Sequence, residues 1–519
     1  MLQEPLLEVH NIQGNILAGF NKDYQILVGL VITDVPDNKR WLALLKDHIA
    51  TVSEVLHFNR LFKALKNKRG QDPKTLCAAW LNIAFSHPGI SKLMSAAQAD
   101  LLPDPAFRVG MPPRSISILG DPSDMQSPFH VSKWKVGAPD SVPDILLIAA
   151  GDTLDAAQRV VDDALRLLPT MGATVIYREI GNTRPDQPGH EHFGFKDGIS
   201  QPAVRGKVST AKNDYLTPRL LTKSDPNSHF YSQPGRTLIM PGEFVLGYST
   251  QSSIDGSVTP TPALEAPWHK NGSFLVFRRL RQDVATFRQF MEAAQQALLA
   301  KMPGIKSEQV AAAFVGRWPN GAPIVRSANH SLDVMATDIA ANAFMFANAM
   351  PRIKLTAGVQ PDAQPSAPSD PLGLICPHWA HVRKVNPRDD VTDLGDGFDT
   401  LKRRMIRRGI PYGPSLPEDS SDDQIDRGLL FLSYQASIVN SFEKVTQDWA
   451  NTTLNPQPNG HDPIIGQSSS PGRSRFVDFK RQEGEPISLP IDVEWVHPTG
   501  GGYFFAPSLE AIGNQLAVN

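Results

Sequence analysis

Cysteine is scarce in this chain, and long apolar runs are absent from it. Its 519 residues include two cysteines, Cys77 and Cys376. Two thiols cannot build a disulfide framework for a chain of this length, and they cannot supply a four-cysteine zinc or iron–sulfur site. The longest apolar stretches, such as 145–150, have the length of a buried strand and fall short of the roughly 18 residues that cross a bilayer. A membrane partner is therefore not expected.

An excess of charge of either sign is also missing. The 51 Lys and Arg residues nearly balance the 53 Asp and Glu residues, which leaves a net charge of −2. Proteins that bind nucleic acid or anionic membranes need a surplus of basic residues, so no nucleic-acid partner is expected. The N-terminus has no basic segment followed by an apolar one, as a signal peptide has. This predicts a cytoplasmic protein, or a secreted one if the N-terminus has been processed or is recombinant.

Hydrophobic periodicity predicts alternating strands and helices, which is typical of a ferredoxin-like α+β sandwich. The predicted strands are 25–35, 76–85, 144–150, 172–180, 242–248, 273–280, 429–434 and 503–505, and the predicted helices are 40–66, 154–168 and 283–299. Two polar segments, 360–370 and 457–475, are expected to be loops. At roughly 150 residues per domain this length predicts two to four domains, or fewer large ones. We place a boundary near 205–240, which gives an N-terminal half, 1–205, and a C-terminal half, 206–519.

A carboxylate flanked by glycine is the first candidate for chemistry. The segment 191–202 reads EHFGFKDGISQP and places Asp197 directly before Gly198. Glycines allow unusual backbone angles or the close approach of a ligand. Asp197 is either an acid/base group at the rim of a pocket or the side chain of an ordinary Asx-turn.

Two histidines three residues apart form the second candidate. The segment 376–388 reads CPHWAHVRKVNPR and contains His378 and His381. On a helix they would share a face and could bind a metal together, one alone could ligate haem iron, or both could be ordinary buried residues. The basic residues that follow, Arg383, Lys384 and Arg388, could neutralise haem propionates.

A cluster of arginines is the third candidate. The segment 401–414 reads LKRRMIRRGIPYGP and ends in a turn rich in glycine and proline. Either one arginine is held rigidly toward the interior, or the cluster is a solvated basic end of an element.

Five motifs taken in order resemble the dye-decolourising peroxidase family, in particular its longer fungal and bacterial members. They are NIQGNIL (11–17), GFKDGISQP (194–202), HVRKVNPR (381–388), IRRGIPYG (406–413) and TGGGYFF (499–505). The resemblance extends over nearly the whole chain. It implies two ferredoxin-like halves of the dimeric α+β barrel type, with antiparallel sheets and peripheral helices. It also implies one haem b per chain, held by the C-terminal half.

The resemblance assigns roles to individual residues. Asp197 matches the distal aspartate, Arg407 the distal arginine, and His381 the axial ligand of the haem iron. The other residues expected around the haem are Gly198, Ile199, Ser200, Arg388, Leu429 and Phe431. A proximal histidine donates its second ring N–H to a carboxylate, and we expect Glu494 or Asp492 to accept it.

The implied activity is that of a haem peroxidase, which reduces hydrogen peroxide to water while it oxidises dyes, phenolics or other aromatic reductants one electron at a time. Asp197 would move the proton and Arg407 would stabilise developing negative charge. A carboxylate base remains ionised at about pH 4 to 5, where imidazole is protonated, so we expect an acidic optimum. The resemblance implies that electrons from bulky dyes enter through surface aromatic residues. Trp379, Tyr412, Tyr434 and Trp449 are candidates, although packing in the core or at its rim is the more common role for each such residue. The alternative is a haem-binding or haem-trafficking protein without turnover, and the oligomeric state stays open.

Overall fold

The structure is a computed structural model. It describes residues 4–73, 76–169, 171–219, 231–233, 236–252, 259–336, 340–349, 367–395, 397, 399–418, 420–470, 472 and 475–518. The predicted loop 360–370 lies outside the described residues up to position 366. Within the described ranges, no helix has the length and apolar character needed to cross a membrane.

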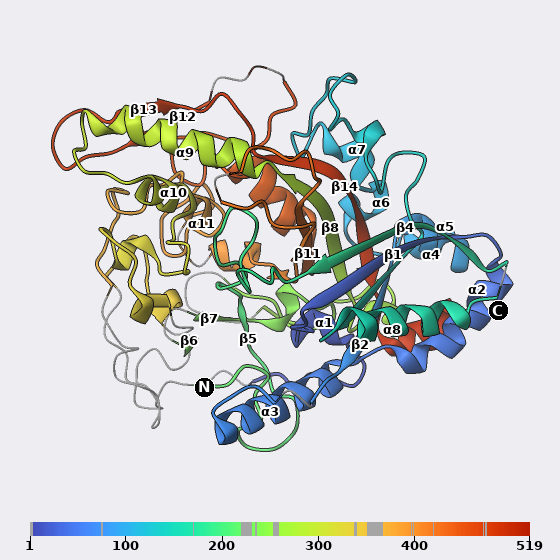
Figure 1. The fold of residues 1–519 in the computed structure, drawn as a ribbon. Coiled ribbons are helices and arrows are strands. Elements are labelled where there is room, and N and C mark those ends of the chain that lie inside the picture. The colour runs from blue at the N-terminus through green and yellow to red at the C-terminus, as the bar shows by residue number, and fades with distance from the viewer. Residues whose placement is uncertain are drawn as a thin grey trace.

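A large antiparallel sheet organises the described part of the chain (Figure 1). Its nine strands run in the order β10-β4-β1-β3-β2-β14-β8-β11-β9. Their bounds are β1 Tyr24–Ile32, β2 Ala79–Phe85, β3 Ile145–Gly151, β4 Ala173–Asn182, β8 Ser273–Gln282, β9 Ile406–Arg407, β10 Ile410–Tyr412, β11 Gly428–Gln435 and β14 Val496–Ala506. Because β10 also pairs with β11, the sheet closes on itself as a barrel.

Both halves of the chain contribute strands to this one sheet. Strands of the two halves meet at two places, and each contact is short: Phe85 of β2 pairs with Phe505 of β14, and Gly181 of β4 pairs with Tyr412 of β10. The α+β barrel agrees with the predicted fold class, and the division near residue 205 stays a prediction.

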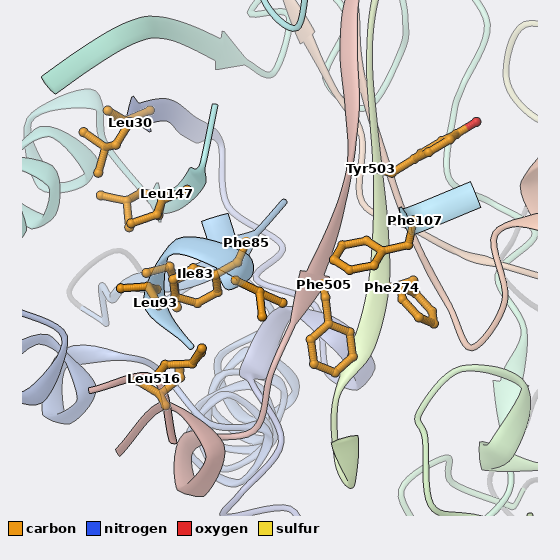
Figure 2. Close-up of a cluster of buried hydrophobic side chains, with 14 of the residues drawn as sticks. Leu30, Ile83, Phe85, Leu93, Phe107, Leu147, Phe274, Tyr503, Phe505 and Leu516 are labelled. Carbon is orange, nitrogen blue, oxygen red and sulfur yellow. The ribbon is translucent and has the colours of Figure 1, made fainter. Parts of the chain in front are cut away.

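Apolar side chains on both faces of the sheet explain why most of its strands are buried. On one face, Phe274 of β8 and Phe505 of β14 have ring centroids 5.4 Å apart, and Phe107 packs against both (Figure 2). The opposite face carries a second cluster that includes Leu275, Phe277 and Phe504. Strands that are apolar on both faces read as continuous hydrophobic runs, which is why sequence analysis finds them.

Helices cover the barrel at its edges. The longest described ones are α2 Val35–Leu45, α3 Val52–Arg69, α8 Leu154–Arg166, α9 Val284–Leu299 and α10 Ser307–Val315. Helix α8 packs on β1, β2 and β3, while α9 lies beside the short hairpin formed by β12 (Phe476–Phe479) and β13 (Ile487–Pro490) (Figure 1).

The predicted helix 40–66 is wrong in its continuity, because two helices occupy this region. Helix α2 ends at Leu45, and α3 begins after Thr51. The Thr51 hydroxyl accepts from the Glu54 N–H, and the Glu54 carboxylate accepts from the Thr51 N–H, which is a capping box. Such reciprocal capping stabilises a new N-terminus and breaks the helix that the apolar spacing predicts.

The predicted strand 242–248 is also wrong. This segment forms a 3₁₀ turn, Pro241–Glu243, followed by further turns. The chain folds back tightly, since a Cβ on Gly242 would lie 2.3 Å from the Tyr248 carbonyl oxygen. Its apolar residues Phe244 and Val245 are fully buried in the turns, so burial alone explains the hydrophobic run.

Candidate active site

His381 lies at the first position of the short helix α11 (His381–Lys384) and pairs with a buried carboxylate. Its Nδ1 is 2.8 Å from Oδ2 of Asp462, whose side chain is fully buried. Burial alone would lower the pKa of His381, but the Asp462 carboxylate outweighs it and the pKa is raised. Burial opposes ionisation of Asp462 too, and the imidazole together with two backbone N–H groups holds its pKa below the usual value. The charge on Asp462 therefore keeps the ring proton of His381 on Nδ1.

The carboxylate that accepts from His381 is Asp462, and the expectation of Glu494 or Asp492 is wrong. Asp492 is exposed and Glu494 is half-buried beside Arg475, and neither lines the cavity that His381 faces. Asp462 belongs to the segment 457–475, which the sequence predicts to be a polar loop.

Hydrogen bonds to the loop backbone fix Asp462 in place. Its Oδ1 accepts from the N–H groups of Ile464 and Ile465, at 2.8 and 3.0 Å. The buried Nζ of Lys384 donates to the Gly460 carbonyl at 2.7 Å, which ties α11 to the same loop. The hydrogen-bonded pair of His381 and Asp462 is thus fixed both through α11 and through the loop 457–475.

Asp197 lies in a tight loop between β4 and β5 (Ala203–Val204). Its Oδ1 accepts from the Gly198 N–H at 2.6 Å, and Gly198 has φ +70°, a conformation that glycine adopts without strain. The preceding turn is closed by Glu191, whose carboxylate accepts from the N–H groups of Phe193 and Phe195. Burial raises the pKa of Glu191 to about 6 despite these bonds.

Arg407 ends the short strand β9 and is fastened to the loop that carries Asp197. Its Nη2 donates to the Ser200 carbonyl at 3.1 Å, and its backbone exchanges two hydrogen bonds with the Gln201 side chain. Burial lowers the pKa of Arg407, and the negative charge of Asp197 counters that effect. The two side chains are therefore close enough to interact electrostatically.

A single cavity of about 300 Å³ brings the distal and proximal groups together. Every residue that the resemblance places around the haem lines it: Asp197, Gly198, Ile199, Ser200, His381, Arg388, Arg407, Leu429 and Phe431. Its walls are mainly apolar and its charged groups are mostly arginines, which include Arg317 and Arg404. Sequence analysis missed Arg317 and did not single out Arg404 within the arginine cluster 401–414, because nothing in their local pattern separates them from surface arginines.

The residues present fit a haem. With Nδ1 of His381 engaged by Asp462, Nε2 has no hydrogen-bond partner among the described residues and is left for a metal. Arg388 stacks 3.7 Å above the centroid of the Phe344 ring at the cavity wall, and Arg404 makes no side-chain hydrogen bond to the described part of the chain. Apolar walls, one free imidazole nitrogen and guanidinium groups that are not paired with a described carboxylate suit a flat, apolar group that bears iron and carboxylates.

The other basic residues near His381 are not available for propionates. Arg383 is buried and pairs with Asp390 and Asp370, and Lys384 is bound to the Gly460 carbonyl. The hypothesis that these two residues neutralise propionates is therefore wrong.

His378 and His381 do not form a metal-binding pair. His378 precedes α11, and its two ring nitrogens bond to the Pro371 carbonyl and the Asn459 side chain. Burial and nearby cations lower the pKa of His378 to about 3. No group of three potential metal-binding side chains occurs within the described ranges.

The aromatic residues expected at the surface are buried. Trp379, Tyr412, Tyr434 and Trp449 are each 1% exposed. A bulky reductant cannot touch any of them directly, so packing in the core, and not a place at the surface, describes all four.

Comparisons with known proteins agree with this architecture. Residues 11–185 match the family model described as the DyP dimeric alpha+beta barrel domain, and residues 250–457 match that of the Dyp-type peroxidase C-terminal domain. The chain is 31% identical to the dye-decolorizing peroxidase msp1 of Mycetinis scorodonius, over 99% of this chain and 88% of that protein. It is 28% identical to the dye-decolorizing peroxidase AauDyP1 of Auricularia auricula-judae, over 98% and 87% respectively.

Solved structures are similar as well. An ancestral D-type dye-decolorizing peroxidase superposes with a TM-score of 0.76 at 30% identity, over 99% of this chain and 100% of that one. The crystal structure of the Auricularia auricula-judae enzyme gives a TM-score of 0.71 at 26% identity, with the same coverage. The chain belongs to the dye-decolourising peroxidase family and is a haem-dependent peroxidase.

Proposed function

We propose that this enzyme reduces hydrogen peroxide to water and oxidises dyes, phenolics or related aromatic compounds one electron at a time. The observation that carries the proposal is the single cavity in which His381, backed by Asp462, shares its walls with Asp197 and Arg407. One haem b per chain would supply the iron at which the peroxide O–O bond is cleaved and the electrons are exchanged. The relatives named above support the class of reductant, because they are dye-decolorizing enzymes.

The residues that would hold the haem come from both halves of the chain. His381 would ligate its iron through Nε2. Leu429 and Phe431 of β11 and the backbone of 198–200 would contact its faces. Arg388 and Arg404 would neutralise its propionates, which form charge-assisted hydrogen bonds with guanidinium groups.

Asp197 is the proton-transfer group in this proposal. Its Oδ1 is occupied by the Gly198 N–H, whereas Oδ2 has no partner in the described part of the chain. Oδ2 would accept a proton from the peroxide oxygen near it and return that proton to the oxygen that leaves as water. The guanidinium of Arg407, held by the Ser200 carbonyl, would stabilise negative charge that develops during cleavage.

The test is the reaction of the haem-loaded enzyme with one equivalent of peroxide, followed by absorption, for wild type, Asp197→Asn and Asp492→Asn. We expect Asp197→Asn to slow the spectral change by about 10²- to 10⁴-fold, which is the usual contribution of a positioned acid–base group. The exposed Asp492 serves as a matched control and should leave the rate unchanged. A Soret band that peroxide leaves unchanged in wild type would indicate haem binding or trafficking without turnover.

The pH dependence provides a second test. The pKa of an ordinary carboxyl group lies about two units below that of an imidazole, so a carboxylate base is still ionised at a pH where an imidazole base is already protonated. We therefore expect the wild-type enzyme to keep most of its rate with peroxide at about pH 4.5, where an imidazole base would be almost fully protonated. A rate at about pH 4.5 that falls to about one hundredth of the rate at about pH 7.5, with the fold intact at both, is what an imidazole base would give and would contradict a carboxylate base.

A further inference from the structure

Arg407 lies on an edge of the barrel sheet where its backbone needs a partner. Strand β9 pairs with β11, and the Arg408 N–H donates to the Leu432 carbonyl at 2.7 Å. Because successive residues of a strand direct their backbone groups to opposite sides, the N–H and C=O of Arg407 face away from β11. The described sheet ends at β9, so no further strand is there to satisfy them. Buried backbone groups without a hydrogen bond are costly, so another group must supply it.

The carboxamide of Gln201 fills the place of the missing strand. The Arg407 N–H donates to Oε1 of Gln201 at 3.1 Å, and Nε2 of Gln201 donates to the Arg407 carbonyl at 3.1 Å. A neighbouring antiparallel residue would exchange the same two bonds. The guanidinium of Arg407 adds a third bond, to the Ser200 carbonyl, so both ends of this arginine are held by one dipeptide.

The same loop carries Asp197, four residues before Gln201. At the other end of the loop, Nε2 of His192 donates to the Tyr412 carbonyl at 2.8 Å. Tyr412 lies on β10, the strand that follows β9 after the turn beyond Arg407. The loop is thus attached to the arginine-bearing segment on both sides of Asp197, which fixes the position of the aspartate relative to the arginine.

We propose that Gln201 is a positioning residue, which sets the geometry between Asp197 and Arg407 by completing the sheet edge at Arg407. This inference rests on the proposed function of that pair. It differs from a purely structural role in one respect: the effect of Gln201 on peroxide chemistry must pass through the Arg407 side chain.

The experiment combines Gln201→Met with Arg407→Leu. Methionine has a similar shape and removes both hydrogen bonds to the Arg407 backbone. Gln251 offers a matched control, because it is buried, its Oε1 accepts from the Met240 N–H, and it does not line the cavity. The rate with peroxide, the fluoride dissociation constant from an absorption titration, and the thermal unfolding midpoint are measured for each haem-loaded variant.

We expect Gln201→Met to slow the reaction with peroxide by about 10- to 100-fold, the cost of misplacing a catalytic group by about 1 Å. It should also weaken fluoride binding, since a positioned guanidinium stabilises an anion through charge-assisted hydrogen bonds. In the Arg407→Leu background the same substitution should change neither quantity by more than about twofold, because coupled residues are non-additive. Gln251→Met should leave both at the wild-type values.

Gln201→Glu keeps the inference testable if Gln201→Met fails to fold or to load haem. A protonated carboxyl group at this position can donate to the Arg407 carbonyl, whereas an ionised carboxylate cannot. The rate of this variant relative to wild type should therefore recover as the pH falls below about 4.3, the reference pKa of glutamate. A ratio that stays flat with pH would overturn the inference.

The remaining outcomes separate the two claims. If Asp197→Asn and Arg407→Leu both react like wild type, the proposed function fails. If those two variants are slow but Gln201→Met is not, the function stands and the positioning role is refuted. If Gln201→Met costs the same factor in the Arg407→Leu background as in wild type, Gln201 acts on the fold in general and the inference is likewise overturned.

Discussion

Replacing Asp462 by asparagine tests how the protein prepares His381 for iron. Oδ1 of Asp462 accepts from two backbone N–H groups, so the oxygen of an asparagine must stay at that position. Its NH₂ group then occupies the Oδ2 position, 2.8 Å from Nδ1 of His381. Two donors cannot bond each other, and the ring relieves the conflict by moving its proton from Nδ1 to Nε2. A protonated Nε2 cannot ligate a metal.

The expected losses of stability and of haem affinity in Asp462→Asn follow from the hydrogen bond between Asp462 and His381. A hydrogen bond to a charged group contributes about 1.5–3 kcal/mol to stability and one between neutral groups about 0.5–1.5 kcal/mol. Asp462→Asn exchanges the first kind for the second while it keeps both backbone bonds, so we expect a loss of about 1–1.5 kcal/mol. Loss of a carboxylate that orients a ligating histidine lowers metal affinity by about 10- to 100-fold. At about 1.4 kcal/mol per factor of ten, this equals about 1.4–2.8 kcal/mol of haem-binding free energy.

The assay is a titration of apo-protein with hemin, with the dissociation constant taken from the Soret absorbance. Nitrogen NMR of the apo-protein provides an independent measurement, because the two ring tautomers of His381 have different shifts. We expect the proton on Nδ1 in wild type and on Nε2 in Asp462→Asn. Urea unfolding of the apo-protein should show the accompanying loss of about 1–1.5 kcal/mol.

Asp492→Asn and Glu494→Gln are the matched controls, because neither carboxylate lines the cavity that His381 faces. Both should bind hemin as wild type does. The reasoning is refuted if Asp462→Asn binds hemin as tightly as wild type, or if the tautomer of His381 is the same with and without the carboxylate.

Three further predictions concern buried charges outside the cavity. Burial lowers the pKa of Lys384 to about 7, below its unfolded value of roughly 10.4. Between these two pH values the unfolded state binds more protons than the folded state, so the wild-type protein loses stability as the pH falls through this range. Urea unfolding at about pH 9 and about pH 7 should therefore show a smaller loss of unfolding free energy for Lys384→Met than for wild type. Burial lowers the pKa of His269 to about 4, below its unfolded value of roughly 6.5, so the wild-type protein loses stability as the pH falls from about 6.5 to about 4. Over the same pH range His269→Leu should lose about 1–2 kcal/mol less unfolding free energy than wild type. Arg383→Met leaves the buried carboxylate of Asp390 without its bidentate partner and should cost about 3–5 kcal/mol in urea unfolding, whereas Arg383→Lys should cost less. The first two expectations would be contradicted if Lys384→Met or His269→Leu lost as much stability with falling pH as wild type does. The third would be contradicted by equal losses for Arg383→Met and Arg383→Lys.

Much of the barrel could be predicted because several of its strands, such as β3 and β8, are apolar on both faces. Strand β3 is fully buried, and its hydrophobic run is bounded by an Asp and a Gly, so its limits were nearly correct. The segment 242–248 is equally apolar but is buried in turns, because Gly242 and Gly247 allow the chain to fold back on itself. Hydrophobicity reports burial, and only the pairing partner decides whether a buried run is a strand.

The residues of the site also differ in whether a local sequence pattern reveals them. Asp197, His381 and Arg407 lie in motifs whose local spacing carries the resemblance, and the structure places all three on one cavity. Asp462 was missed because its contact with His381 spans 81 residues, and its only local signal is an Asx-type pattern of bonds to the next residues in the loop. Many loop aspartates share that pattern, so sequence alone does not single this one out.

The charges around the cavity indicate what kind of group completes it. Burial and neighbouring arginines lower the pKa of Arg404 to about 9, and burial lowers that of Arg317 to about 10. Arg388 and Arg407 add two more positive charges at the same cavity, whereas Asp197 and Glu191 are the acidic residues among its lining side chains. Arginines that repel one another in a partly desolvated site destabilise the protein until an anion enters. A group with two carboxylates relieves this repulsion, so the surplus of arginine favours haem with its two propionates over a neutral or cationic ligand.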